Sequence, residues 1–234
     1  AREMWVYRSA SGGRLCRTIL TISPSADCIR VRRDGLSANP FRVLLSVART
    51  DATGDNMSDQ VLKVPRSLRR GGRLEESERS VRDTLKIIAL VCRNLGIDNL
   101  AESRILDMGC GYRMAKSIIE RDIPIKEYVG LDVFRDMIEF LREEVNDPRF
   151  SFHSLDIHNE MYNPQGKPLA ELGALPISKE SFDIIWLCSV FTHLAPHDYS
   201  EMSKLLRPYV RPGGRLVFSL FVNEVTPSGL GFIS

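Results

Sequence analysis

The spacing of apolar residues in the second half of the chain changes between a helical period and short continuous runs. Between residues 81 and 95 apolar positions recur at intervals of three and four, and Gly96 follows them, which predicts a helix that ends at the glycine. Five short, mostly apolar runs further along predict buried strands. The first begins at Arg104, and the others span residues 128–133, 150–155, 182–188 and 215–221.

Apolar stripes with helical spacing lie between these runs. They consist of Ala115, Ile118 and Ile119; of Phe134, Met137, Ile138, Leu141 and Val145; and of Met202, Leu205, Leu206 and Tyr209. Strands that alternate with helices predict a parallel sheet with right-handed crossovers. The predicted fold class is therefore α/β, with a doubly wound and mostly parallel sheet.

Composition divides the chain into three regions. Residues 1–56 contain nine arginines and no lysine, residues 57–73 are polar and linker-like, and residues 74–234 carry the α/β pattern. Stretches at 17–23, 28–33 and 42–49 resemble short strands without sustained alternation. We interpret residues 1–56 as a disordered or non-native segment that any ligand site can do without. The composition changes near Met57, a candidate natural start.

Overall composition is that of a soluble globular protein, with 43% hydrophobic and 26% charged residues. The formal net charge of +2 is too small to indicate nucleic acid or an anionic membrane as a partner. No apolar run approaches the ~18–20 residues that cross a bilayer, and a secretion signal pattern is missing. The five scattered cysteines are typical of reduced thiols, so we expect a cytoplasmic protein without a zinc site.

Glycines and acids gather where the predicted strands end, which is where ligands bind in a doubly wound sheet. Asp107 ends the first strand, and Gly109 and Gly111 in the following turn allow close approach of the backbone to a ligand. Asp132 ends the second strand and can accept both hydroxyl groups of a ribose. Asp156 after the third strand can accept from an exocyclic amine of a base. Together these residues describe a slot for a nucleoside.

Five motifs along the chain resemble those of class I S-adenosylmethionine-dependent methyltransferases. They are Ile105-Leu-Asp-Met-Gly-Cys-Gly111, Tyr128-Val-Gly-Leu-Asp132, Leu155-Asp156-Ile157, Ser181-Phe-Asp-Ile-Ile-Trp-Leu-Cys-Ser189 and Leu206-Arg-Pro-Tyr-Val-Arg-Pro-Gly-Gly-Arg-Leu-Val217. The resemblance covers residues 75–222, and five motifs in the right order are specific where one alone is weak. Stretches at 162–167 and 190–194 are similar to a bacterial branch of this family.

The resemblance implies S-adenosyl-L-methionine as the cofactor and assigns a role to each strand end. The glycine turn would border the methionine part, the second-strand acid would hold the ribose, and the third-strand acid with the next backbone group would hold the adenine. The cofactor contacts implied are Asp107, Gly109, Gly111, Asp132, Asp156, Ile157 and Ser189.

Two features depart from the family pattern. The third glycine of the first motif is missing, and Arg113 stands in this turn, either as a cation for the cofactor carboxylate or as a surface residue. The family sheet has seven strands, whereas this chain stops 13 residues after Phe221, so we expect the last two strands to be lacking.

The predicted activity is methyl transfer to an unidentified acceptor, a small molecule or a glycan- or lipid-type metabolite. His193 follows the fourth strand and is the candidate general base, although a structural histidine fits the same position. The insert 159–177 is rich in proline and glycine and is expected to be a surface loop over the acceptor site. The alternatives are a non-catalytic nucleoside-binding domain and an NAD-dependent oxidoreductase, whose G-x-G-x-x-G pattern would need glycine at Met114.

Overall fold

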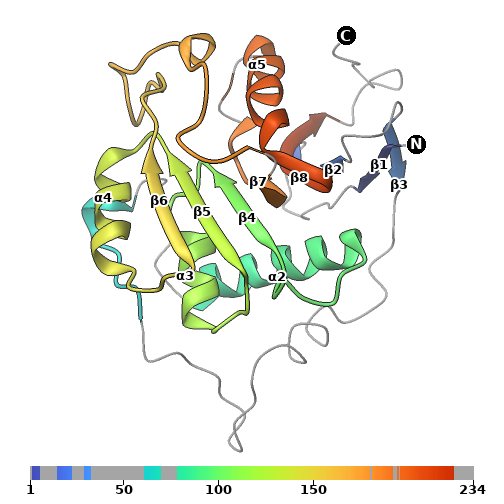
Figure 1. Cartoon of the computed structure of the whole chain (residues 1–234), viewed down its shortest axis with the longest axis horizontal. Helices are drawn as coiled ribbons and strands as arrows, with labels where there is room; N and C mark the ends of the chain where they lie inside the picture. Colours follow the sequence, from blue (N-terminus) through green and yellow to red (C-terminus); the bar gives the residue numbers. More distant parts are fainter. Residues whose placement is uncertain are drawn as a thin grey trace, which may run out of the picture.

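A six-stranded sheet with the strand order β2-β8-β7-β4-β5-β6 forms the centre of the molecule (Figure 1). The computed structural model describes residues 2–5, 15–22, 29–32, 61–69, 78–179, 181–191, 194 and 196–223. The strands of the sheet are β2 (Leu15–Ile22), β4 (Arg104–Met108), β5 (Glu127–Asp132), β6 (Phe150–Ser154), β7 (Phe182–Leu187) and β8 (Val210–Asn223). Two further strands, β1 (Arg2–Trp5) and β3 (Ile29–Arg32), pair in parallel with each other.

Five strands of the sheet, β4 to β8, are parallel, which confirms the predicted α/β class. The helices α2 (Glu78–Leu95), α3 (Arg113–Glu120), α4 (Arg135–Glu144) and α5 (Pro196–Leu206) connect or flank them. Three short 3-10 helices are η1 (Arg66–Leu68), η2 (Leu169–Glu171) and η4 (Arg207–Tyr209). Because parallel strands end on the same side, the acids at or just after the carboxyl ends of β4, β5 and β6 lie along one edge of the sheet.

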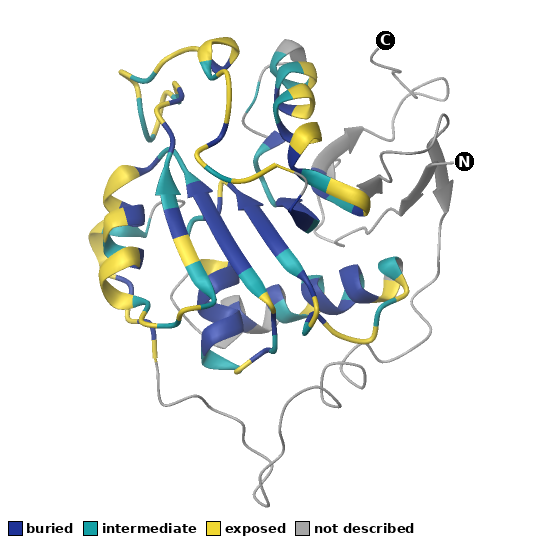
Figure 2. Ribbon diagram, viewed as in Figure 1, coloured by how far each residue is buried: buried dark blue, intermediate teal, exposed yellow. Residues whose placement is uncertain are grey.

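Side chains that alternate along the strands divide the core into two layers. Ile105 and Tyr128 belong to a cluster with residues of α2, α3 and α4, whereas Leu106 and Val129 belong to a cluster with residues of α5 and of the segment after β6. The sheet is therefore covered on both faces, as a doubly wound sheet should be. β4 and β5 are buried along most of their length, while the segment after β6 carries many exposed residues (Figure 2).

The last strand begins earlier than its apolar pattern predicts. Val210 already pairs with Phe182, and the pairing resumes between Arg215 and Ile184 after an irregularity. Gly213 has φ +80°, a conformation that glycine adopts without strain. The chain therefore passes through this glycine-containing bulge within β8, whereas the apolar pattern predicts a strand only from residue 215.

The edge of the sheet beyond β8 holds a strand from the N-terminal part of the chain, and no strand follows β8 within the described residues. β2 lies there and pairs with β8 in antiparallel register, from Leu15 opposite Asn223 to Ile22 opposite Leu216. β8 is thus paired on both sides, with β7 and with β2. β2 belongs to the Arg-rich segment 1–56, so part of that segment is a strand. Of the other strand-like stretches, 28–33 contains β3, and 42–49 lies outside the described residues.

Part of the stretch interpreted as a linker packs onto the domain. Leu62 and Val64 are 2% and 1% exposed and belong to the same apolar cluster as α2 and α3. The buried ammonium group of Lys116 donates to the carbonyl of Leu62 at 2.6 Å and also pairs with Glu120. Residues 61–69 are therefore attached to the core. The apolar side chains of Leu62 and Val64 are buried, although most of the surrounding stretch is polar.

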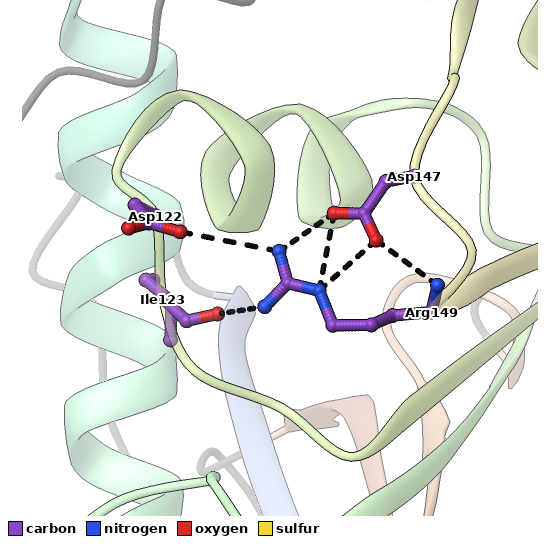
Figure 3. A network of polar contacts seen from close by, with 4 residues as sticks. All are labelled: Asp122, Ile123, Asp147 and Arg149. Atoms are coloured by element: carbon purple, nitrogen blue, oxygen red, sulfur yellow. Dashed lines mark hydrogen bonds and ion pairs between the residues drawn. The ribbon is translucent and has the colours of Figure 1, made fainter.

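At the end of the sheet where the parallel strands β5 and β6 begin, Arg149 joins two loops (Figure 3). Its guanidinium donates to both oxygens of Asp147, donates to the carbonyl of Ile123 at 3.4 Å, and lies 4.0 Å from Asp122. Burial alone would raise the pKa of Asp147, but the side-chain and backbone hydrogen bonds of Arg149 outweigh it and lower the pKa. This network ties the loop before β6 to the loop before β5, away from the acids that follow the strands.

Within the described part of the chain, no helix combines the length and the apolar character that a membrane crossing needs. The same residues contain no group of three or more His, Cys, Asp or Glu side chains arranged to hold a metal ion.

Candidate functional site

The turn after β4 brings the backbone into a narrow space. Gly109 and Gly111 have φ +70° and +47°, and a Cβ atom on Gly109 would lie 2.5 Å from Cγ2 of Val190. Glycine is therefore required at 109 both by conformation and by the neighbouring side chain. The amides of Gly109 and Cys110 donate to the carbonyl of Leu131 at 2.7 and 3.1 Å. These contacts hold the turn against the end of β5 and against the loop after β7.

Asp132 is the centre of the site. Its Oδ2 accepts the N–H of Gly111 at 2.8 Å, and its Oδ1 accepts the N–H of Phe134 at 2.9 Å. Burial raises the pKa of Asp132, and the backbone hydrogen bonds act in the opposite direction. The side chain is nevertheless partly exposed, and each carboxylate oxygen has a second lone pair. The carboxylate is thus fixed in place and still able to accept a hydrogen bond from a ligand.

Asp107 lies beneath the turn. It is 2% exposed, and its Oδ2 accepts a hydrogen bond from the hydroxyl of Tyr128 at 2.6 Å. Burial raises the pKa of Asp107 to about 7, the Tyr128 hydrogen bond lowers it, and the charge of Asp132 raises it further. Because the carboxyl group already has a protein partner in the interior, the structure supports a role in shaping the turn; a contact of Asp107 with the cofactor stays a prediction.

Asp156 and Ile157 follow β6 and begin a tight loop beside the end of β5. The N–H of Leu155 donates to the carbonyl of Asp132 at 2.8 Å, so the two strand ends adjoin. Asp156 is exposed, whereas Ile157 is buried, with an exposed fraction of 6%. The Nδ2 group of Asn163 donates to the carbonyl of Ile157 at 3.0 Å and to Oδ1 of Asp156 at 3.4 Å.

Arg113 is the first residue of α3 and has an exposed side chain. Within the described residues its guanidinium makes no hydrogen bond or ion pair, and its carbonyl accepts the hydroxyl of Ser117 at 2.8 Å. The guanidinium is therefore accessible to an anion beside the glycine turn. Either role proposed for Arg113, carboxylate partner or surface residue, remains open to experiment.

Ser189 follows β7 with φ +64°, an uncommon conformation for a residue with a side chain. Its N–H donates to the hydroxyl of Ser219 in β8 at 2.7 Å, and Ser219 is buried. This strained residue lies beside Val190, which contacts the glycine turn. His193, the candidate base, lies outside the described residues.

The structure brings together the turn at 109–111, Asp132 and the loop that begins at Asp156, as the motif spacing predicts. It also adds residues that sequence reasoning missed. Tyr162 in the insert packs its ring 5.7 Å from that of Phe134, next to Asp132. The sequence alone gives little indication of this aromatic pair. Phe134 and Tyr162 belong to different segments and come into contact only because the insert folds back.

Comparisons with known proteins agree with this geometry. Residues 106–216 match the family model described as a methyltransferase domain. Phthiotriol/phenolphthiotriol dimycocerosates methyltransferase 1 of Mycobacterium ulcerans is 26% identical over 146 residues, 62% of this chain and 46% of that protein. Malonyl-(acyl-carrier protein) O-methyltransferase of Methylococcus capsulatus is 30% identical over 121 residues, 51% of this chain and 38% of that protein. This chain therefore spans less than half the length of both relatives.

Among solved structures, an S-adenosylmethionine-dependent methyltransferase from Mesorhizobium loti aligns over 56% of this chain and 51% of its own, with 18% identity and a TM-score of 0.40. The comparisons give no support to the NAD-dependent oxidoreductase alternative. The family match, together with the order of the motifs, confirms the resemblance found in the sequence. Over residues 106–216 this chain is similar to a methyltransferase domain, in agreement with the motifs.

Proposed function

We propose that the protein binds S-adenosylmethionine at the carboxyl ends of β4, β5 and β6 and transfers its methyl group to a small-molecule or lipid-type acceptor. The observation that carries the proposal is the fixed and partly exposed carboxylate of Asp132, held by two backbone N–H groups. Two oxygens with free lone pairs at a fixed position fit the two hydroxyl groups of a ribose. The fit of the other strand ends is consistent, since Asp156 is exposed for an amine and the space where Gly111 would carry a side chain is open to a ligand.

When bound, the cofactor supplies a methyl group that its sulfonium already activates. The residues of this chain would then mainly hold the acceptor in line with the bond that breaks. An oxygen or nitrogen acceptor also loses a proton, and we assign its removal to His193, with Tyr199 as the second candidate. Tyr199 packs edge-on against Phe191, with 5.2 Å between the ring centroids, just after the segment that holds His193.

The insert 159–177 is proposed to cover the acceptor side of the slot. It is fixed at its far end, where the hydroxyl of the buried Tyr209 accepts the N–H of Leu175 at 2.6 Å. Met161, by contrast, is 56% exposed near its other end. A cover that carries an exposed apolar side chain suits an acceptor with an apolar part.

The names of the relatives support the same acceptor class, because one is a dimycocerosates methyltransferase and the other acts on a malonyl group on an acyl-carrier protein. The small net charge argues against nucleic acid as a partner. The scattered cysteines support a cytoplasmic location.

Calorimetry with S-adenosylmethionine, S-adenosylhomocysteine and NAD tests the binding half of the proposal. Binding of the first two ligands and not of NAD is expected. The catalytic half is tested by release of S-adenosylhomocysteine when the protein is incubated with lipid, acyl-thioester and small polar fractions. Absence of binding to both adenosyl ligands would reject the proposal, whereas binding without turnover on any fraction would favour the non-catalytic alternative.

A further inference from the structure

The loop after β6 is closed by its own backbone. The N–H of His158 donates to the carbonyl of Lys167 at 2.7 Å, and the N–H of Lys167 donates to the carbonyl of Asp156 at 3.2 Å. Inside this closure, Asn159 and Asn163 exchange two backbone hydrogen bonds of 2.9 Å. The loop is therefore a compact unit that starts at the acid assigned to the adenine side of the slot.

The side-chain amide of Asn163 is held at the centre of this loop. Its Nδ2 group donates to the carbonyl of Ile157 at 3.0 Å and to Oδ1 of Asp156 at 3.4 Å. A Cβ atom on Gly166 would lie 2.4 Å from this Nδ2 and 2.5 Å from the carbonyl of Ile157. The glycine leaves just enough room for the amide, so Asn163 has little freedom to turn away from Asp156.

The same loop reaches the ribose side of the slot. Tyr162, adjacent to Asn163, packs its ring against Phe134, whose N–H donates to Asp132. A shift of the loop would therefore move both the Tyr162 ring and the Asp156 carboxylate. This connection places the loop along the side of the slot between the two acids.

We propose that Asn163 is a positioning residue that holds the Asp156 carboxylate as a hydrogen-bond acceptor and so sets a preference for 6-amino over 6-oxo purine nucleosides. The inference rests on the proposed function. Asn163 donates to Oδ1, while Oδ2 of Asp156 accepts no hydrogen bond within the described residues. An ionised carboxylate only accepts, so it matches a purine amino group and opposes a purine carbonyl oxygen at the same place.

The experiment compares S-adenosylhomocysteine with its 6-oxo analogue, S-inosylhomocysteine, by calorimetry on the full chain. The wild type is expected to bind the amino ligand more tightly, and Asn163→Ala to reduce that preference by about tenfold or to abolish it. Asn159→Ala is the matched control, because Oδ1 of Asn159 accepts the amides of Met161 and Tyr162 in the same loop at 3.0 and 3.1 Å and makes no contact with Asp156. The control should weaken both ligands by the same factor.

A double-mutant cycle with Asp156→Ala separates positioning from loop stability. If Asn163 acts through Asp156, the preference is already lost in Asp156→Ala and the second substitution changes it no further. An unchanged preference in Asn163→Ala, or an equal loss in Asn159→Ala, would overturn the inference while leaving the proposed function intact. Failure of the wild type to bind either ligand would instead reject the proposed function and the inference with it. Thermal unfolding of each variant verifies that it is folded.

Discussion

The hydroxyl of Tyr128 donates a hydrogen bond of 2.6 Å to Oδ2 of Asp107, beneath the glycine turn of the slot. Both side chains are buried, and the described residues offer Asp107 no ion pair. Burial, the largest effect, raises the pKa of Asp107 to about 7. In the unfolded chain the same carboxyl group ionises near pH 4. The stability of the turn is therefore coupled to pH.

The Asp107→Asn substitution is expected to flatten the pH dependence of stability between about pH 4 and 7. In this range the folded wild type retains a proton that the unfolded chain has released, so its free energy of unfolding falls as pH rises, by at most about 1.4 kcal/mol per pH unit. Asparagine can accept from Tyr128 without titrating. Urea unfolding at several pH values measures the slope, and Asp136→Asn on the exposed side of α4 serves as the control. Identical slopes in wild type and Asp107→Asn would contradict the coupling.

The Asp132→Ala substitution is expected to raise the Kd for S-adenosylmethionine about tenfold or more, because it removes the acceptors for the ribose. It also leaves the N–H groups of Gly111 and Phe134 without their acceptor, so a loss of roughly 1–3 kcal/mol in stability accompanies it. Calorimetry and urea unfolding measure the two effects. Asp136→Ala, four residues along, controls for the loss of a nearby charge. An unchanged Kd would remove Asp132 from the site.

The Arg113→Met substitution tests the cation at the start of α3. It keeps much of the side-chain length and removes the charge, so stability should change little. If the guanidinium pairs with the cofactor carboxylate, binding of S-adenosylmethionine weakens about tenfold while binding of its decarboxylated analogue changes less. Arg121→Met, at the other end of the same helix, is the matched control. Equal effects on the two ligands, or no effect on either, would make Arg113 a surface residue.

The Arg149→Met substitution is expected to lower stability by about 1 kcal/mol near pH 7, since the Asp147 pair is only partly buried. The folded-state pKa of Asp147 is lowered, so the contribution of the pair is present above pH 4 and is lost as pH falls through that pKa. The difference between wild type and variant should therefore shrink in acid. Lys204→Met, which removes the exposed partner of Glu201, should change stability by no more than about 0.5 kcal/mol at any pH. A difference that is as large in acid as it is near pH 7 would contradict this assignment.

Shortened chains test the two N-terminal regions separately. A chain that begins at Met57 keeps Leu62 and Val64 in the core and should still bind S-adenosylmethionine. A chain that begins at Gly71 loses both side chains, each worth about 2–5 kcal/mol when deleted from a core, and should unfold at much lower urea concentration. Circular dichroism and calorimetry distinguish the outcomes. Loss of binding in the first chain would show that residues 1–56 belong to the domain.

The positions of the helices and parallel strands could be predicted because apolar spacing is a local signal. The predicted helix 81–95 lies within α2, and the strand predicted to end in an acid contains β5, which ends at Asp132. β8 begins earlier than predicted because Gly213 allows pairing to continue through a stretch without apolar residues. The stretch 17–23 was recognised as strand-like, but the pairing of β2 with β8 could not be predicted, since the paired residues are about two hundred positions apart and β2 has no sustained alternation.

Candidate site residues could be proposed from the sequence where the residue type and its place at a strand end together suggest a role. Gly109, Asp132 and Asp156 are of this kind. Contacts between side chains far apart in sequence were not. The hydrogen bond of Tyr128 to Asp107 depends on the register that sets β5 beside β4, and Asn163 depends on how the insert folds back. Arg113 and Asp107 were both assigned to the cofactor. The structure shows Arg113 exposed and Asp107 buried, and both assignments stay predictions.

The antiparallel pairing of β2 with β8 covers one side of the 14-residue β8 and makes the eight-residue β2 the edge of the sheet instead. Without β2, one side of β8 would present a row of free N–H and C=O groups, a template on which strands of other molecules can add. A chain that begins at Met57 would then bind the cofactor as a monomer at low concentration and self-associate through this open margin as concentration rises. In that case the N-terminal strand keeps the protein from self-associating and takes no part in the reaction. Light scattering, which measures the size of particles in solution, would detect the loss of β2, whereas an activity assay would not.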